Sequence, residues 1–311
     1  MSSEVFTFEH MFLGDERKKY RELRSKTPKH NRGDFCSNLA FLTNFMNSVE
    51  DKATVIFLGN YTSHIAPLAR FFPNVTFHCY FGSPYGLEDH PRVIIHSEEF
   101  NDEIAKSYFA LERDEPLYYI ANCAHSKNQN QKPKKAQRLI EGLNKRSRWY
   151  YLIHPTEALV LFALPYPDHS KEQVFSFLDG TLVCCPYGES DSAVSRIIPN
   201  GKNRDWNLKE YDERMFHFNS MTRTSFFENP MPDNGGQKFM QYDEAYERFV
   251  VQKYLSMLPI RLSPMGVEKF LDKAYGGWGS KFYYETRRSP ERVLKKWVYL
   301  PKREETIEKS C

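Results

Sequence analysis

The strongest constraint on the fold is an alternation of short apolar runs with segments of helical periodicity. Ala53–Leu58 is an apolar, β-branched run that ends at Gly59, a pattern typical of a strand buried on both faces of a parallel sheet. Further runs of this kind lie at 75–81, 93–96, 116–121 and 158–164. Because helical segments separate the runs, the sequence predicts an α/β fold with a mostly parallel central sheet flanked by helices.

The helical segments are predicted from apolar residues that recur every three to four positions. They cover residues 35–49, 63–71, 98–111, 134–152, 208–221 and 242–258. Past Pro165 the pattern changes: Asp179-Gly180 predicts a turn between two strands, 174–178 and 181–185, and a further strand follows at 192–198. We divide the chain into an N-terminal extension (1–34), a main domain (35–260) and a C-terminal extension (261–311).

Length and composition exclude several classes of protein. The chain has 311 residues, enough for one or two domains, and only a small positive net charge of +3. No apolar run reaches the roughly 18 residues of a membrane-spanning helix. The N-terminus lacks a basic leader before an apolar block, so we expect an intracellular protein without a membrane segment. The six cysteines form no CxxC pair, which predicts buried thiols in a reducing compartment and no metal or disulfide framework.

Positive charge is concentrated in one segment between His125 and Arg148, where Glu141 is the single acid. Such a segment can bind RNA phosphates along one face, or it can be a solvated loop and helix face. The candidate phosphate-binding residues are Lys127, Lys132, Lys134, Lys135, Arg138, Lys145, Arg146 and Arg148.

Ligands of open α/β sheets bind at the carboxyl ends of the strands, so the residues after each predicted strand are the first candidates for a site. The loop Gly59-Asn60-Tyr61 has a single glycine, whereas a nucleotide or S-adenosylmethionine site favours several glycines and an acid after the second strand. We interpret this loop as a structural turn. The sequence also lacks the P-loop, HExxH and GxSxG motifs.

A more specific candidate follows the fifth strand, in the segment Leu164-Pro-Tyr-Pro-Asp168. In an extended backbone Tyr166 and Asp168 lie on the same side, held between prolines. An aromatic face beside a carboxylate can stack a cationic purine and accept its N–H donors. The alternative is a strand-end turn in which Asp168 caps a short helix.

Several segments, taken in order, resemble the poxvirus cap-specific mRNA 2′-O-methyltransferases, which also serve as the small stimulatory subunit of the viral poly(A) polymerase. The matching segments, within residues 30–258, are Ala53-Thr-Val-Ile-Phe-Leu-Gly-Asn-Tyr-Thr-Ser-His-Ile65, Tyr119-Ile-Ala-Asn-Cys-Ala-His-Ser-Lys127, Leu164–Asp168 and Tyr211-Asp-Glu-Arg-Met-Phe-His-Phe-Asn219. The resemblance implies a Rossmann-like methyltransferase fold.

The resemblance also implies that the catalytic residues of the family are not retained. The family's Lys-Asp-Lys-Glu set falls near Arg32 to Asp34, at Asn122, at Leu161 and near Val194. Because a leucine neither accepts a proton nor carries a charge, the general base is missing where the chemistry needs one. The cofactor loop is shortened at Tyr61-Thr62, and the ribose-binding acid appears as Gly82 or Ser83. We therefore assign no catalytic residue and expect no bound S-adenosylmethionine.

The family's pocket for the 7-methylguanine of the mRNA cap matches better. Tyr166 and Asp168 correspond to its strand-end aromatic and carboxylate, Asp212 next to Glu213 corresponds to its second carboxylate, and Tyr20 is our candidate for the second aromatic. Methylation makes the base cationic, which strengthens stacking and its hydrogen bonds to carboxylates.

The resemblance therefore favours an inactive methyltransferase-like protein of a large DNA virus that binds capped mRNA in the host cytoplasm. It would act in translation initiation or transcript processing, beside a scaffold or helicase partner. Two alternatives stay open: a stimulatory subunit that binds RNA next to a poly(A) polymerase catalytic subunit, and an active cap 2′-O-methyltransferase.

Overall fold

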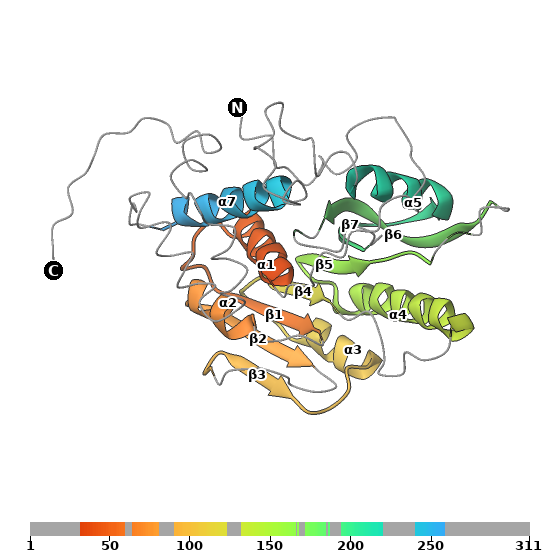
Figure 1. The fold of residues 1–311 in the computed structure, drawn as a ribbon. Helices are drawn as coiled ribbons and strands as arrows, with labels where there is room; N and C mark the ends of the chain where they lie inside the picture. The colour runs from red at the N-terminus through yellow and green to blue at the C-terminus, as the bar shows by residue number, and fades with distance from the viewer. Residues whose placement is uncertain are drawn as a thin grey trace, which may run out of the picture.

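The computed structural model consists of one central sheet with helices on both faces (Figure 1). The structure describes residues 32–59, 64–80, 90–122, 132–165, 167, 172–184, 186, 194–219 and 240–258. The two predicted extensions, apart from residues 32–34, lie outside these ranges.

The sheet has seven strands. In their order across the sheet they are β3 (Val93–His96), β2 (Val75–Tyr80), β1 (Ala53–Leu58), β4 (Leu117–Ala121), β5 (Glu157–Phe162), β7 (Ser195–Asn207) and β6 (Val174–Cys184). The first five strands are parallel, and β7 runs antiparallel to both β5 and β6. This arrangement confirms the predicted Rossmann-like α/β fold with a mostly parallel sheet.

The helices form two layers. On one face α1 (Arg32–Phe45) packs against α2 (Ile65–Phe71) and α7 (Met240–Ser256), and on the other α3 (Asp102–Ala110) packs against α4 (Lys132–Ile153). A sixth helix, α5 (Leu208–His217), follows β7 directly. No helix in the described ranges is both long and apolar enough to cross a membrane.

Capping residues set helix boundaries that apolar periodicity alone missed. The predicted helix 98–111 begins at Asp102, because the side chain of Asn101 accepts a hydrogen bond from the backbone N–H of Ile104 at 2.9 Å. The predicted helix 35–49 ends at Phe45, and the carboxylate of Asp51 accepts from the backbone N–H groups of Asn47 and Ser48 in the following turn. Both helices exist as predicted, with shifted ends.

The predicted turn at Asp179-Gly180 is wrong, because both residues lie inside the continuous strand β6. The pairing of β6 with β7 shifts there: Leu178 is opposite Asn203, but Gly180 is opposite Pro199. Three residues of β7, 200–202, therefore stand opposite the single residue Asp179, and β7 bulges out by two residues. Gly180 has a φ of +154°, and a Cβ on it would lie 2.0 Å from the carbonyl oxygen of Ile198, so this bulge requires glycine.

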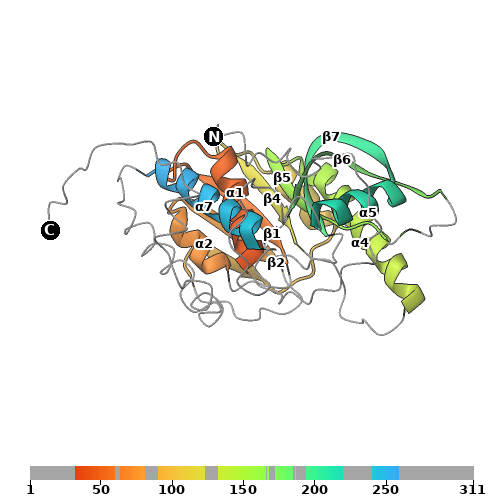
Figure 2. The ribbon, with the colours of Figure 1, turned by 45° about the horizontal axis from the view of Figure 1, so that its top comes forward.

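The bulge allows the second half of the β6–β7 ribbon to fold back over the sheet. Trp206, near the end of β7, packs against Phe162 at the end of β5, with ring centroids 4.8 Å apart. Figure 2 shows β7 curving beside α5. The fold-back brings α5 to the edge of the sheet where the parallel strands end.

Two cysteines in the described ranges, Cys36 and Cys79, are free and buried. This confirms for these two residues that they serve as small apolar side chains.

Candidate functional site

The carboxyl ends of the parallel strands form the edge where open α/β sheets bind ligands. We call this the carboxyl edge. The backbone N–H of Asn122, after β4, donates to the carbonyl of Leu58 at the end of β1 at 2.6 Å. Ser195, at the start of β7, pairs with Phe162 at the end of β5. Residues distant in sequence therefore meet at one edge.

A buried ion pair links the first turn of α1 to β7 at this edge. Nη2 of Arg196 lies 2.5 Å from Oδ1 of Asp34, and the Arg196 side chain is only 4% exposed. Arg196 is opposite Leu161 across the β5–β7 pair. Buried charges of this kind need partners, because desolvation penalises an isolated ion. The carboxylate of Asp34 therefore serves as the counter-charge of Arg196.

A second buried polar pair joins α1 to the start of α2. Nδ2 of Asn38 lies 2.9 Å from Nε2 of His64, and both residues are fully buried. Burial lowers the pKa of His64 to about 4; the carboxylate of Asp34 opposes this shift and Arg196 adds to it. The imidazole is therefore neutral at pH 7, but it lies in the core, where a substrate cannot reach it.

Several buried polar atoms at the carboxyl edge have no hydrogen-bond partner among the residues that the structure describes. They are Oδ1 and Nδ2 of Asn122, Oδ1 of Asn38 and Nε of Arg196. Each such atom costs about 1–3 kcal/mol of desolvation free energy when nothing replaces water. Asn122 thus leaves both a donor and an acceptor unsatisfied by the described residues.

Aromatic contacts fix α5 beside the end of β5. The rings of Phe162 and Tyr211 lie 5.0 Å apart at 84°, and the Tyr211 hydroxyl lies 3.0 Å from Oγ of Ser195. Asp212, the next residue, is buried at 3% exposure, whereas Glu213 is partly exposed. The structure thus places Tyr211, the residue before Asp212, at the end of β5. Tyr166, Asp168 and Tyr20 themselves lie outside the described residues.

Four described residues, Asp34, Asn122, Leu161 and Val194, lie at or near the positions to which the resemblance carries the catalytic set. Leu161 is a buried apolar residue at 3% exposure, and Val194 is exposed at 40%. Asn122 provides an amide and Asp34 an ion-paired carboxylate. None of these groups is suited to take a proton from a ribose hydroxyl.

The structure describes only the edges of the predicted cofactor region, Gly59 after β1 and Tyr80 at the end of β2. A Cβ on Gly59 would lie 2.4 Å from the ring of Phe57, so packing within β1 explains this glycine. The last residue of β2 is Tyr80, whose ring stacks on His96 at 4.2 Å and whose hydroxyl lies 2.9 Å from that of Tyr108. Gly82 and Ser83, to which the resemblance carries the ribose-binding acid, lie outside the described residues. Asn60 and Tyr61 lie outside the described residues.

Only some of the residues of the predicted basic strip are exposed on the surface of the protein. Along α4, Lys145 is exposed, Arg138 is partly exposed, and the exposed Arg148 forms an ion pair with Asp102. Arg146 is buried at 3% exposure, in contrast to Lys145, and the assignment of the strip to RNA phosphates stays a prediction. Three lysines lie on α4, but their side chains are not among those that the structure describes: Lys132, Lys134 and Lys135. Lys127 lies outside the described residues.

The solved structures that are similar to this chain include one viral and one human protein. One is bluetongue virus VP4, reported as "a multifunctional RNA-capping production-line", with 14% identity over 64% of this chain and a TM-score of 0.41. The other is human methyltransferase-like protein 13 in complex with SAH, with 9% identity over 77% of this chain and 99% of that chain, and a TM-score of 0.31. Our chain spans 33% of the VP4 chain. No protein-family model and no curated protein matches the sequence.

The sheet topology by itself establishes a Rossmann-like α/β fold. Within this fold, sequence reasoning missed the Asp34–Arg196 and Asn38–His64 pairs. One signal was present: Arg196 interrupts the apolar strand pattern of residues 192–198, and a charge there needs a buried partner. Its partner is 162 positions away, which no local pattern reveals. Within the described ranges, no three His, Cys, Asp or Glu side chains are grouped to hold a metal ion.

Proposed function

We propose that this protein binds the 5′ cap of mRNA without transferring a methyl group. The proposal is carried by the contrast between two polar side chains at the carboxyl edge. The amide of Asn122 has unsatisfied hydrogen-bonding atoms that suit a ligand, while the carboxylate of Asp34 is held by Arg196. Such an edge favours binding over proton abstraction.

The position of α5 supports the cap pocket. The rings of Tyr211 and Phe162 are in contact at the end of β5, and in the proposal the buried carboxylate of Asp212, the next residue on α5, faces the segment that contains Tyr166. In the proposal Tyr166 stacks on the 7-methylguanine, and Asp168 and Asp212 accept its N–H donors. Glu213 and Tyr20 complete the pocket. A methylated, cationic base binds such a pocket more tightly than guanine does.

The basic residues of α4 serve the following phosphates in this proposal. The residues proposed to contact these phosphates are Lys127, Lys132, Lys134, Lys135, Arg138, Lys145 and Arg148. The partner is capped mRNA of a large DNA virus, related to the poxvirus family, in the host cytoplasm. A translation-initiation scaffold or helicase would use the bound transcript, and no S-adenosylmethionine would be needed.

The decisive experiment is calorimetric titration of the purified protein with 7-methyl-GTP, GTP and S-adenosylmethionine in parallel. We expect saturable binding of 7-methyl-GTP, weaker binding of GTP and no response to S-adenosylmethionine. Tyr166→Ala should abolish binding of 7-methyl-GTP. Tyr151→Ala is a matched control, because Tyr151 lies near the end of α4 with its hydroxyl on Asn203.

Other outcomes separate the alternatives. Binding of S-adenosylmethionine, followed by methyl transfer to capped RNA, would establish an active 2′-O-methyltransferase. Silence toward all three ligands, combined with cap-independent binding of uridylate-rich RNA, would favour the poly(A) polymerase subunit. Unchanged affinity in Tyr166→Ala would overturn the pocket assignment.

A further inference from the structure

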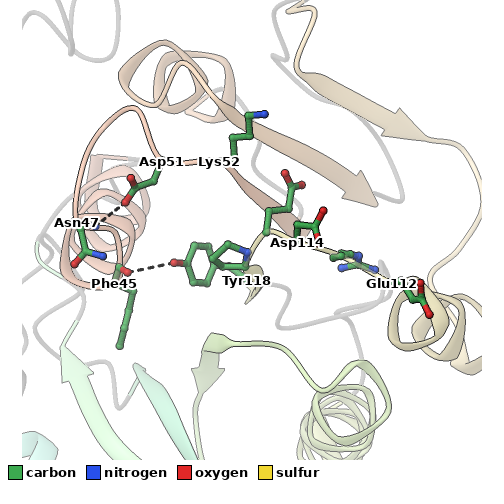
Figure 3. A pocket seen from close by; sticks show the side chains of 10 residues that line it. Phe45, Asn47, Asp51, Lys52, Glu112, Asp114 and Tyr118 are labelled. Atoms are coloured by element: carbon green, nitrogen blue, oxygen red, sulfur yellow. Dashed lines mark hydrogen bonds between the residues drawn. The ribbon is translucent and has the colours of Figure 1, made fainter.

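A hollow of about 650 Å³ lies at the amino edge of the sheet, at the opposite ends of the strands from the carboxyl edge (Figure 3). We call it the amino-edge hollow. It lies between the end of α1, the start of β1 and the loop that leads into β4. Phe45, Pro116 and Tyr118 contribute apolar surface, and the Tyr118 hydroxyl donates to the carbonyl of Phe45 at 3.2 Å. The hollow has the size of a typical binding pocket.

Some of the charges that line the hollow are already used by the fold. Asp51 accepts from two backbone N–H groups, and Glu115 accepts from the hydroxyl of Thr54 at 2.5 Å. The guanidinium of Arg113 lies 5.3 Å from the ring centre of Tyr108 and donates to the carbonyl of that residue. These groups hold the hollow in shape.

Two carboxylates of the rim stay available. Glu112 and Asp114 are exposed, and neither enters an ion pair or hydrogen bond with the described part of the chain. Lys52 is the exposed cation on the other side, next to Asp51 in Figure 3. Since the lining has four acidic and two basic residues, the hollow favours a cationic group.

Exposed apolar side chains lie directly before this rim. Phe109 is 62% exposed and Leu111 is 59% exposed, at the end of α3 and one residue past it. Single exposed apolar residues are common on surfaces, but here two of them adjoin a hollow with an aromatic wall. Apolar anchors beside charged groups are typical of protein–protein interfaces.

We propose that the amino-edge hollow docks a partner protein through a segment in which arginine or lysine alternates with apolar residues. The basic side chain would enter the hollow and pair with Glu112 and Asp114, while apolar neighbours would cover Phe109 and Leu111. An RNA occupant is disfavoured, because the acidic rim repels phosphates. The proposal goes beyond cap binding, and since the two sites lie at opposite edges of the sheet, both can be occupied together.

The test uses a fluorescein-labelled peptide of sequence Arg-Leu-Arg-Phe-Arg-Leu and the full-length protein, with fluorescence anisotropy as the readout. The double variant Glu112→Lys/Asp114→Lys should bind the peptide about tenfold more weakly or not at all. The variant Phe109→Ser/Leu111→Ser should also weaken binding. Glu99→Lys/Glu103→Lys, which changes the net charge equally at exposed positions at and before the start of α3, should leave binding within about twofold.

The proposal is overturned by any of three results. They are no saturable binding of the peptide, equal losses in the two charge-reversal variants, or equally tight binding of a peptide in which glutamate replaces arginine. Concentration-dependent self-association that the Glu112→Lys/Asp114→Lys variant abolishes would show a second copy as the occupant and would also overturn it. Titration of the same variants with 7-methyl-GTP tests cap binding separately, so each proposal can fail alone.

Discussion

Nη2 of Arg196 lies 2.5 Å from Oδ1 of Asp34, and this ion pair joins β7 to the first turn of α1 across 162 positions of sequence. The pair fills the part of the carboxyl edge to which the resemblance carries a catalytic lysine. This pair also influences the pKa of the neighbouring His64.

Replacing Asp34 with alanine should destabilise the protein. The variant leaves the buried guanidinium of Arg196 without its counter-charge, and breaking a pair of this kind costs about 3 kcal/mol or more. Urea denaturation would show this as a lower midpoint with an unchanged slope. The double variant Asp34→Leu/Arg196→Met should recover most of the loss, because it removes both charges. A double variant no more stable than Asp34→Ala would show that the ion pair is not the reason.

Stability should fall as the pH is lowered from 6.5 toward 4, because His64 is buried in its neutral form. The pKa of His64 is about 4 in the folded protein, whereas the ordinary pKa of a histidine is 6.5. The unfolded chain therefore binds more protons than the folded protein between pH 4 and 6.5. The full contribution, about 3 kcal/mol, is present above pH 6.5 and is lost by about pH 4.

The measurement is the free energy of unfolding of the protein and of His64→Gln across this pH range. Burial and the neighbours His96 and Arg113 also lower the pKa of His78, so some dependence of the same sign remains in the variant. The difference between the two proteins isolates His64. Identical pH profiles would contradict the assignment.

Gly180→Ala should be among the most destabilising substitutions on β6. Its Cβ would meet the backbone oxygen of Ile198, and backbone cannot move aside cheaply, so we expect a loss of about 3 kcal/mol. Gly201→Ala is the matched control: its φ is +82°, but nothing lies within 4 Å of the added Cβ, so the loss should be about 1 kcal/mol. Thermal unfolding of both variants tests the bulge, and equal losses would contradict the clash.

Asn122→Leu should separate stability from binding. Removing two unsatisfied buried polar atoms should raise the free energy of unfolding by about 1 kcal/mol or leave it unchanged. The same variant should bind a capped oligonucleotide more weakly, because it lacks the side-chain amide that the proposal offers to the ligand. Loss of stability without loss of RNA affinity would show that Asn122 is purely structural.

The exposed and buried basic residues of α4 should respond differently to alanine. Arg138→Ala and Lys145→Ala should each weaken RNA binding and reduce the slope of log affinity against log salt by about 1. Arg146→Ala should leave this slope unchanged and lower the melting temperature instead, because Arg146 is buried. Equal salt slopes for all three variants and the unmodified protein would remove α4 from the RNA-binding surface.

The sequence by itself determined the alternation of strands and helices and hence the fold class. Runs such as Ala53–Leu58 carry this information locally, because a strand buried on both faces must be apolar throughout. The sequence also located the candidate edge, since the carboxyl ends of parallel strands meet at one side of the sheet. Helix ends shifted by several residues wherever a cap such as Asn101 competed with apolar periodicity.

Only the tertiary structure decided what fills that edge. Asp179-Gly180 has the composition of a turn, but pairing with β7 makes it part of a bulged strand, which folds Trp206 and α5 back over Phe162. Arg146 carries the same charge as Lys145, and the orientation of α4 alone buries one and exposes the other. The Asp34–Arg196 pair likewise depends on two elements far apart in sequence. Such contacts follow from the packing of whole elements, because neither local propensity nor charge pattern specifies which distant side chains meet.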